Sequence, residues 1–439
     1  MFEVTVASGY LIFYTIMLFF SELSDKIHKK YNLGGEKMEY MYKVFYKEPQ
    51  KYEKEYDKRI TAPNVELLDL TIRPYKTNDK FNLYYIPTSK ILNLVNDIEK
   101  NNSKLIEHAI NLPEAATESL HKDIIVNELF STNQIEGVKS SKQEIVNSMK
   151  EIKENPKKVV RFKSMLNSYL GILYEQNELP KSPKDIKKIY NMIAEEEVNT
   201  SDKLDGELFR KDTVKVVTST NKIIHEGVNP HEKIINHLQK LLDFLNTPNN
   251  IALVIKIAIS HYYMGYIHPF YDGNGRTSRF INSLYLDKEY DNLTAISLSR
   301  AIDNNKKTYY DIFDKTNSVI NKGELNYFID NFLKFIKEGQ KELIEELSIK
   351  KAQLHHASKK IGNDQLLESL TDNHKSIMFI LAQIQYFSLE ETTTVQELSA
   401  YLKVSEQTVR KLMNKLIELK YVDKSGIRPV RYKAIEGYF

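Results

Sequence analysis

Apolar residues recur every three or four positions along most of the chain, a spacing that is typical of amphipathic helices. This pattern predicts helices over residues 91–111, 113–134, 141–153, 160–176, 182–197, 230–246 and 250–267. Residues 207–228 differ because β-branched side chains cluster there and Gly227 follows them, which predicts a short hairpin or flap. We therefore expect an all-α fold that carries one small β-hairpin flap.

The pattern changes again near residue 373. Thr394 and Glu397 have the spacing of a capping box, and Ser405 is placed to cap a further helix that ends near Leu419. One face of that helix is apolar, and its other face carries Thr408, Arg410, Lys411, Asn414 and Lys415. Two short β-rich stretches follow, around Gly426 and Pro429.

This arrangement resembles a winged helix-turn-helix, in which the third helix enters the major groove of DNA. The five polar residues of that helix are then candidate DNA contacts, and Lys424, Arg428 and Arg431 could meet phosphates. Winged helices also act as protein-binding or dimerising modules, so this alternative stays open.

The first 37 residues are ambiguous. Residues 4–20 carry no charge and reach the lower limit of membrane-spanning length, and Lys26, Lys29 and Lys30 follow them. Three interpretations compete: a membrane anchor, a buried helix, and a start codon wrongly assigned upstream of Met38. The third is favoured by residues 34–37, Gly-Gly-Glu-Lys, whose purine-rich codons can resemble a bacterial ribosome-binding site.

The composition of the chain excludes several kinds of functional site. The chain has 439 residues, a net charge of only +3 and no cysteine. The absence of cysteine excludes a disulfide scaffold, a thiolate zinc site, an iron–sulfur cluster and a cysteine nucleophile. The balanced charge argues against a polybasic protein, although a local basic patch remains compatible with it. A cytoplasmic location fits, with anchoring through residues 4–20 as the alternative.

The candidate chemistry lies in residues 268–279, His-Pro-Phe-Tyr-Asp-Gly-Asn-Gly-Arg-Thr-Ser-Arg. Pro269 disfavours helical geometry at His268, so a helix should end there and present the imidazole. Gly273, Asn274 and Gly275 tolerate positive φ and can turn backbone N–H groups toward an anion. The helix that starts near Arg276 adds the positive end of its dipole.

The side chains of this loop fit phosphate chemistry. Arg276 and Arg279 lie one turn apart and offer forked donors to phosphate oxygens. Asp272 is a hard oxygen ligand suited to Mg²⁺. His268 has an ordinary pKa near neutrality and could take a proton from an attacking hydroxyl. The loop therefore predicts the transfer of part of a nucleotide to a hydroxyl.

The stretch is similar to the signature of the Fic family, H-P-F-x-D/E-G-N-G-R-x-x-R, and matches it at each defined position. The resemblance extends over residues 91–337. It implies an adenylyltransferase that moves AMP from ATP to a Ser, Thr or Tyr hydroxyl of a protein, with Mg²⁺ or Mn²⁺. It further implies the general base His268, the metal ligand Asp272 and phosphate contacts from Gly273, Asn274, Gly275, Arg276 and Arg279.

A second motif precedes the loop. Residues 131–137, Ser-Thr-Asn-Gln-Ile-Glu-Gly, resemble the family's inhibitory helix motif, with Thr132, Glu136 and Gly137 at the matching positions. The resemblance implies that Glu136 pairs with Arg279 and denies this arginine to the γ-phosphate of ATP. The other interpretation of Glu136 is a solvated residue at a helix end.

The resemblance to the family is less direct in two further regions. The flap resembles the family element that aligns a target segment by strand pairing, which would place Val216, Val217, Thr218 and Ser219 near the nucleotide. Asn317 falls where some relatives contact adenosine. The expected domains are residues 1–37, an arm over 38–90, the Fic domain over 91–337, a connecting helix over 338–372 and the winged helix over 373–439.

The first hypothesis is therefore a self-inhibited protein adenylyltransferase that also modifies itself. The second is a DNA-binding transcriptional regulator in which the Fic loop senses nucleotide. A third keeps the fold but removes AMP or transfers another phosphate-containing group. The expected partners are ATP, an unidentified target protein, DNA and a second copy of the chain.

Overall fold

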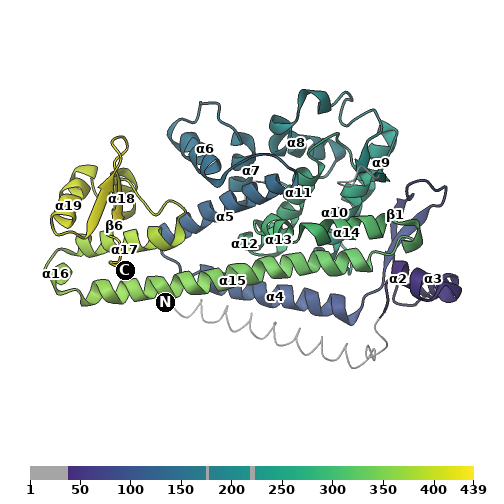
Figure 1. The fold of residues 1–439 in the computed structure, drawn as a ribbon, viewed down its shortest axis with the longest axis horizontal. Helices are drawn as coiled ribbons and strands as arrows, with labels where there is room; N and C mark the ends of the chain where they lie inside the picture. Colours follow the sequence, from purple (N-terminus) through teal and green to yellow (C-terminus); the bar gives the residue numbers. More distant parts are fainter. Residues whose placement is uncertain (1–37, 175–176, 218–222) are drawn as a thin grey trace.

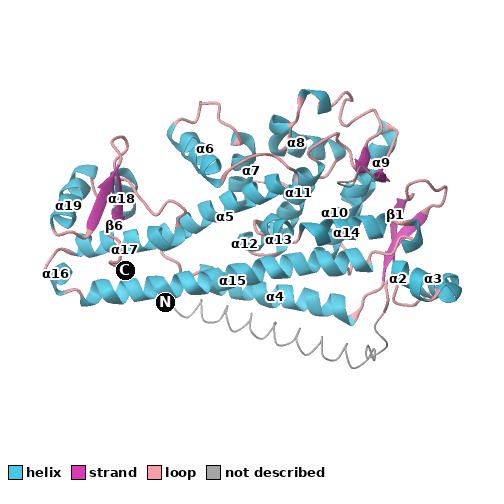
Figure 2. Cartoon of the chain, viewed as in Figure 1, coloured by secondary structure: helices cyan, strands magenta, loops and turns pink. Residues whose placement is uncertain are grey.

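The computed structural model describes residues 38–174, 177–217 and 223–439. Helices dominate this part of the chain, as the sequence predicted, and its strands form three small antiparallel pairs (Figure 2). A single long helix, α15, runs across the molecule with α4 packed along it (Figure 1). The predicted segment at residues 4–20 lies outside the described residues. Within the described ranges, no helix is both long enough and apolar enough to cross a membrane.

The middle of the chain forms a helical core around α10. This helix is buried on almost all sides, which explains why its sequence is apolar throughout rather than on one stripe. Helices α9, α11 and α15 pack against it. The helices of this region are α4 (Ser89–Ala109), α5 (Glu114–Ile135), α6 (Lys142–Glu154), α7 (Lys163–Leu173), α8 (Pro183–Ile193), α9 (His231–Asn246), α10 (Leu253–Ile267), α11 (Asn274–Glu289), α12 (Asn292–Ala295), α13 (Leu298–Asn304) and α14 (Lys306–Asn317).

The predicted arm consists of short elements. They are the helices α2 (Met41–Lys47) and α3 (Tyr52–Ile60), the short turn η1 (Pro49–Lys51) between them, and the paired strands β1 (Glu66–Ile72) and β2 (Phe81–Tyr85). A buried ion pair joins this arm to the core. Arg59 pairs with Glu324, whose side chain is fully buried and also accepts a hydrogen bond from the Met41 amide at 3.2 Å.

Breaking this pair should destabilise the protein. Burial raises the pKa of Glu324 to about 7 while Arg59 opposes the shift, so the carboxylate depends on its partner. We expect Arg59→Met to lower the free energy of unfolding by about 3–5 kcal/mol, because it leaves a buried charge unpaired. Arg59→Met/Glu324→Leu should recover much of that loss, since both charges are then gone. Urea denaturation checks this, and equal stability of the two variants would contradict it.

The C-terminal region begins on the same helix that closes the core. Helix α15 (Asn326–Asn363) is continuous through residue 338, so the predicted connecting helix is its second half. The elements that follow are α16 (Gln365–Glu368), α17 (Asp372–Phe387), α18 (Val395–Leu402), α19 (Glu406–Glu418), β5 (Val422–Ser425) and β6 (Arg431–Ala434). The capping box of Thr394 with Glu397 and the Ser405 cap are both present, as predicted.

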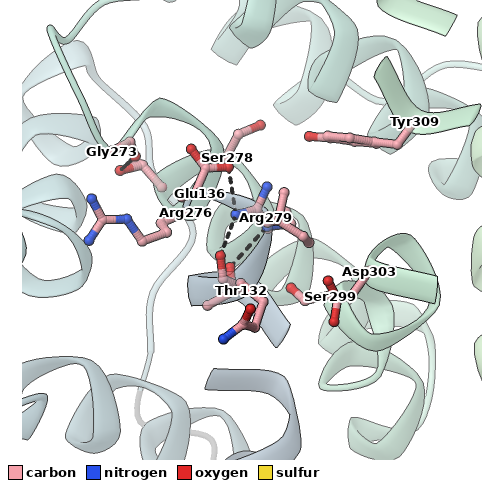
Figure 3. Close-up of polar contacts among 12 residues, drawn as sticks. Thr132, Glu136, Gly273, Arg276, Ser278, Arg279, Ser299, Asp303 and Tyr309 are labelled. Atoms are coloured by element: carbon pink, nitrogen blue, oxygen red, sulfur yellow. Dashed lines mark hydrogen bonds and ion pairs between the residues drawn. The ribbon is translucent and has the colours of Figure 1, made fainter. Parts of the chain in front are cut away.

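Helix α5 connects the two halves of the molecule. Its first half packs against α17, and the Ala116 amide donates a hydrogen bond to Oε1 of Gln383 at 3.1 Å. The side chain of Ala115 belongs to the apolar core of the C-terminal region. The last turn of α5 lies against α11 of the helical core (Figure 3). One straight helix therefore contacts the winged helix at one end and the signature loop at the other.

Candidate active site

The candidate site is built where α10 ends. The helix stops at Ile267, as Pro269 predicts, and His268 adopts a left-handed conformation with φ 51°. A residue other than glycine rarely takes this conformation, and such strain is typical of functional positions. Arg210 holds the backbone there, because its Nε donates to the His268 carbonyl at 2.8 Å.

The imidazole of His268 is neutral. Burial, followed by the neighbouring His225 and Arg210, lowers its pKa to about 3. At neutral pH the ring therefore has a free lone pair and can accept a proton. The unprotonated ring is the form in which a general base acts, and a pKa of about 3 makes it a weak proton acceptor in the absence of ligand.

The glycines of the loop allow close approaches. Gly273 has φ 80° and precedes the first residue of α11; a Cβ there would lie 2.5 Å from Cβ of Ala194. A Cβ at Gly275 would lie 2.1 Å from Oε1 of Glu136. The side chain of Asn274 is used within the loop, because it accepts from the Phe270 amide and donates to the Phe270 carbonyl. These two bonds fix the Asn274 side chain in the loop and leave one N–H of its amide without a hydrogen-bond partner among the described residues.

Both arginines of the loop are fully buried, and their guanidinium groups point in different directions (Figure 3). Arg276 donates to Oδ2 of Asp272 at 3.2 Å. Its Nε and Nη1, together with Nη1 of Arg279, have no hydrogen-bond partner among the described residues. Buried donors without partners are costly, so these three groups fit an anionic ligand.

Arg279 is held by α5. Its Nη2 donates to Oε1 of Glu136 at 2.9 Å and to the Thr132 carbonyl at 3.1 Å, and its Nε donates to Oγ1 of Thr132 at 2.9 Å (Figure 3). Glu136 is the residue that ends α5, and Gly137 follows with φ 74°. The structure thus brings together the three motif residues of α5 and the last arginine of the loop.

A pocket of about 210 Å³ opens beside these groups. The expected flap residue Val216 lines it, and so does Asn317, whose Oδ1 accepts a hydrogen bond from Tyr262. Val217 ends strand β3, whereas Thr218 and Ser219 lie outside the described residues. The other lining residues are Glu136, Ile224, His225, His261, Gly265, His268, Asn274, Gly275, Ser278, Tyr309, Tyr310 and Phe313.

The flap is a hairpin of β3 (Lys215–Val217) and β4 (Ile223–Glu226), as predicted. Sequence reasoning missed what ties it to the loop. Arg210 is fully buried, and besides the His268 carbonyl it donates to the carbonyls of Asp212 and Val228, at 2.7 and 2.8 Å. The sequence shows Arg210 at the end of a Gly-x-x-x-Arg pattern. Its hydrogen bonds could not be predicted, because they depend on how the flap folds back.

A second missed group is His261. Its Nδ1 accepts hydrogen bonds from Ser278 and Asn282, at 3.0 and 2.7 Å, so its Nε2 donates to Tyr309 at 2.9 Å. Burial lowers its pKa well below the ordinary value, and the neutral ring cross-links α10, α11 and α14 behind the pocket. A histidine seven residues before His268, about two turns earlier on the same side of α10, was the available signal.

The residues predicted to face DNA lie on the outside of α19. Arg410, Lys411 and Asn414 are exposed, and Thr408 and Lys415 are half-buried. Arg410 pairs with Glu406 and Lys415 with Glu418 along the helix. One expected phosphate contact differs: Arg431 turns inward, where it donates to Oγ1 of Thr392 at 2.7 Å and pairs with Glu390 at 3.2 Å.

Comparison with known proteins identifies two regions. Residues 180–286 match the Fic/DOC family, and residues 381–425 match a DeoR-like helix-turn-helix domain. Protein adenylyltransferase fic-1 of Caenorhabditis briggsae is 37% identical over 57 residues, and that of Caenorhabditis elegans is 35% identical over 57 residues. Each match spans 12% of this chain and only 11% of the relative.

Solved structures of Fic proteins are similar to this chain at low sequence identity. A Fic family protein from Desulfovibrio desulfuricans is 16% identical with a TM-score of 0.48, over 83% of this chain and 99% of that one. Fic-1 from Caenorhabditis elegans is 17% identical with a TM-score of 0.39, over 60% of this chain and 74% of that one. The family matches over residues 180–286 and 381–425 confirm the predicted resemblances of the loop and of the C-terminal region.

Proposed function

From the premise that this chain carries a Fic/DOC domain and a DeoR-like helix-turn-helix domain, we propose that it is a protein adenylyltransferase. It moves AMP from ATP to a Ser, Thr or Tyr hydroxyl of a target protein and of itself. Glu136 restrains the activity through its pair with Arg279. The observation that carries the proposal is a neutral His268 next to a loop in which three buried guanidinium nitrogens have no partner among the described residues.

The chemistry follows from these groups. His268 accepts the proton of the attacking hydroxyl, whose oxygen forms a bond to the α-phosphorus. The bond from that phosphorus to the bridging oxygen breaks, and pyrophosphate leaves with the electron pair. The N-terminus of α11 and the arginine donors stabilise the negative charge on the phosphates.

The residues present also fit a divalent metal ion. Asp272 offers a partly exposed carboxylate at the start of the phosphate loop. Mg²⁺ is often bound by one or two carboxylates together with substrate phosphates and water, and the described residues include no larger cluster of ligands. We propose that Asp272 holds Mg²⁺ or Mn²⁺, which neutralises phosphate charge when bound.

Labelled ATP separates the candidate reactions. Glu136→Gly protein is incubated with Mg²⁺ or Mn²⁺ and with ATP labelled on either the α- or the γ-phosphate. Covalent label from the α-position alone supports AMP transfer, and label from the γ-position alone indicates phosphate transfer. Loss of label from protein that is already modified indicates AMP removal. No covalent label from either position would contradict the proposal and favour a nucleotide-sensing regulator.

DNA binding through the winged helix is a second candidate function, favoured by the exposed Arg410 and Lys411 on α19. We expect affinity for random-sequence duplex to fall steeply with salt, because each neutralised phosphate releases counterions. Arg410→Gln/Lys411→Gln should reduce the slope of log affinity against log salt by about 2. Filter binding at several salt concentrations measures it.

The matched control for the DNA experiment is Lys100→Gln/Lys104→Gln, which removes two exposed charges from α4. This control should leave the slope unchanged. Equal slopes for both double variants would mean that DNA binds elsewhere on the protein or does not bind to it. Self-association, which was expected from the sequence, is checked by sedimentation at the same salt concentrations.

A further inference from the structure

We propose that Lys306 and Tyr310 on α14 are positioning residues that hold the last turn of α5 and thereby keep Glu136 on Arg279. The inference rests on the proposed restraint by Glu136 and identifies what maintains it. It concerns residues outside the two sequence motifs, and one of them, Lys306, does not line the nucleotide pocket.

The contacts are made to the backbone of α5. Nζ of Lys306 donates to the Gln134 carbonyl at 3.0 Å, and Oη of Tyr310 donates to the Ile135 carbonyl at 2.9 Å. The last carbonyls of a helix have no partner within it, and a cation there also interacts favourably with the helix dipole. These two carbonyls directly precede Glu136, so their restraint fixes the direction in which its side chain leaves the helix.

Both side chains are themselves held in place. Asp303, one turn earlier, pairs with the ammonium of Lys306 at 2.8 Å. The ring of Tyr310 meets that of Tyr309 edge to face, with 5.5 Å between the centroids. Burial and the nearby Glu136 raise the pKa of Tyr310, so its hydroxyl remains a donor at neutral pH.

The chain reversal that follows Glu136 has open space beside it. A Cβ at Gly137 would find no atom within 4 Å, so the chain reversal is loosely surrounded. Its own backbone bonds run to the same turn, with the Val138 amide donating to the Asn133 carbonyl at 2.9 Å. Among the described residues, the polar contacts from α14 and Arg279 therefore add to the apolar packing of this turn, in which the side chain of Ile135 is buried in the core.

A gain of activity tests the proposal, because a misfolded variant cannot produce it. We expect Lys306→Met and Tyr310→Phe each to raise the initial rate of AMP transfer about threefold to tenfold over the unchanged protein. The matched control is Lys307→Met, since Lys307 is exposed and its side chain has no ion pair among the described residues. In a Glu136→Gly background, neither substitution should raise the rate further.

Hydrogen exchange gives a second readout that does not depend on catalysis. Protection of the Val138 amide should fall in Lys306→Met and stay unchanged in Lys307→Met. If Glu136→Gly is fast but the two α14 variants keep the unchanged rate or lose activity, the inference is overturned while the proposed function stands. If Glu136→Gly transfers AMP no faster than the unchanged protein, the restraint by Glu136 and this inference are overturned while AMP transfer stands. If neither protein transfers AMP, the proposed function is overturned as well.

Discussion

Glu136→Gly is expected to raise the rate of AMP transfer about tenfold to a hundredfold. The Glu136 carboxylate bonds to Nη2 of Arg279 and lies against Gly275, where the phosphates should bind. A hydrogen bond between charged groups is worth ~1.5–3 kcal/mol, and each 1.4 kcal/mol corresponds to a factor of ten. Removing it frees the guanidinium and clears the loop. Initial rates of label incorporation measure the gain.

Glu136→Gly should also lower the stability of the protein when no nucleotide is bound. Arg279 is fully buried, and removing its carboxylate leaves that charge with Thr132 alone. The melting temperature of Glu136→Gly should therefore fall, and ATP should raise it more than it does in the unchanged protein. Glu136→Gln, which keeps the size and loses the charge, should be intermediate in rate. Equal rates in all three proteins would remove the inhibitory role of Glu136.

His268→Ala, made together with Glu136→Gly, should lower the rate by about 10²–10⁴, because the attacking hydroxyl loses its proton acceptor. The phosphate contacts come from the glycines and arginines of the loop, so ATP should bind the double variant nearly as well. Calorimetric titration of ATP supplies this control. A double variant that transfers AMP at an undiminished rate would exclude His268 as the base.

The pH dependence follows from the same residue. His268 acts in its neutral form, and a pKa of about 3 leaves that form dominant at all pH values above 4. The rate should therefore show no decline from imidazole protonation between pH 8 and pH 5, and should fall only as the pH approaches 3. An NMR titration of the ring follows its protonation directly. A titration near the ordinary pKa of 6.5 would contradict the buried, neutral ring.

Local signals predicted local structure well. Pro269 ended α10 and Ser405 capped α19, because each acts through its own backbone neighbours. The start of α11 was expected near Arg276 but lies at Asn274, since Gly273 has a positive φ whereas the next two residues are already helical. The pairing of Glu136 with Arg279 was predicted from motif resemblance, and the structure brings the two residues into contact.

The features that the sequence did not predict depend on packing between distant segments. Nothing in the pattern near Arg431 distinguishes a side chain that faces phosphates from one that turns inward to Glu390. The contacts of Arg210 and Lys306 are to main-chain carbonyls, which every residue has, so no partner residue marks them in the sequence. The expected boundary at residue 338 followed a change to charged residues, but this residue lies inside α15, which continues to Asn363.

The contact between α5 and α17 bears on how the protein should be handled in the laboratory. An excised catalytic fragment that ends within α15 would lose Gln383 and expose Ala115 and Ala116 to water. The inhibitory helix would then lack its far support. Basal rates measured on such a fragment would be a poor proxy for the resting state of the whole chain.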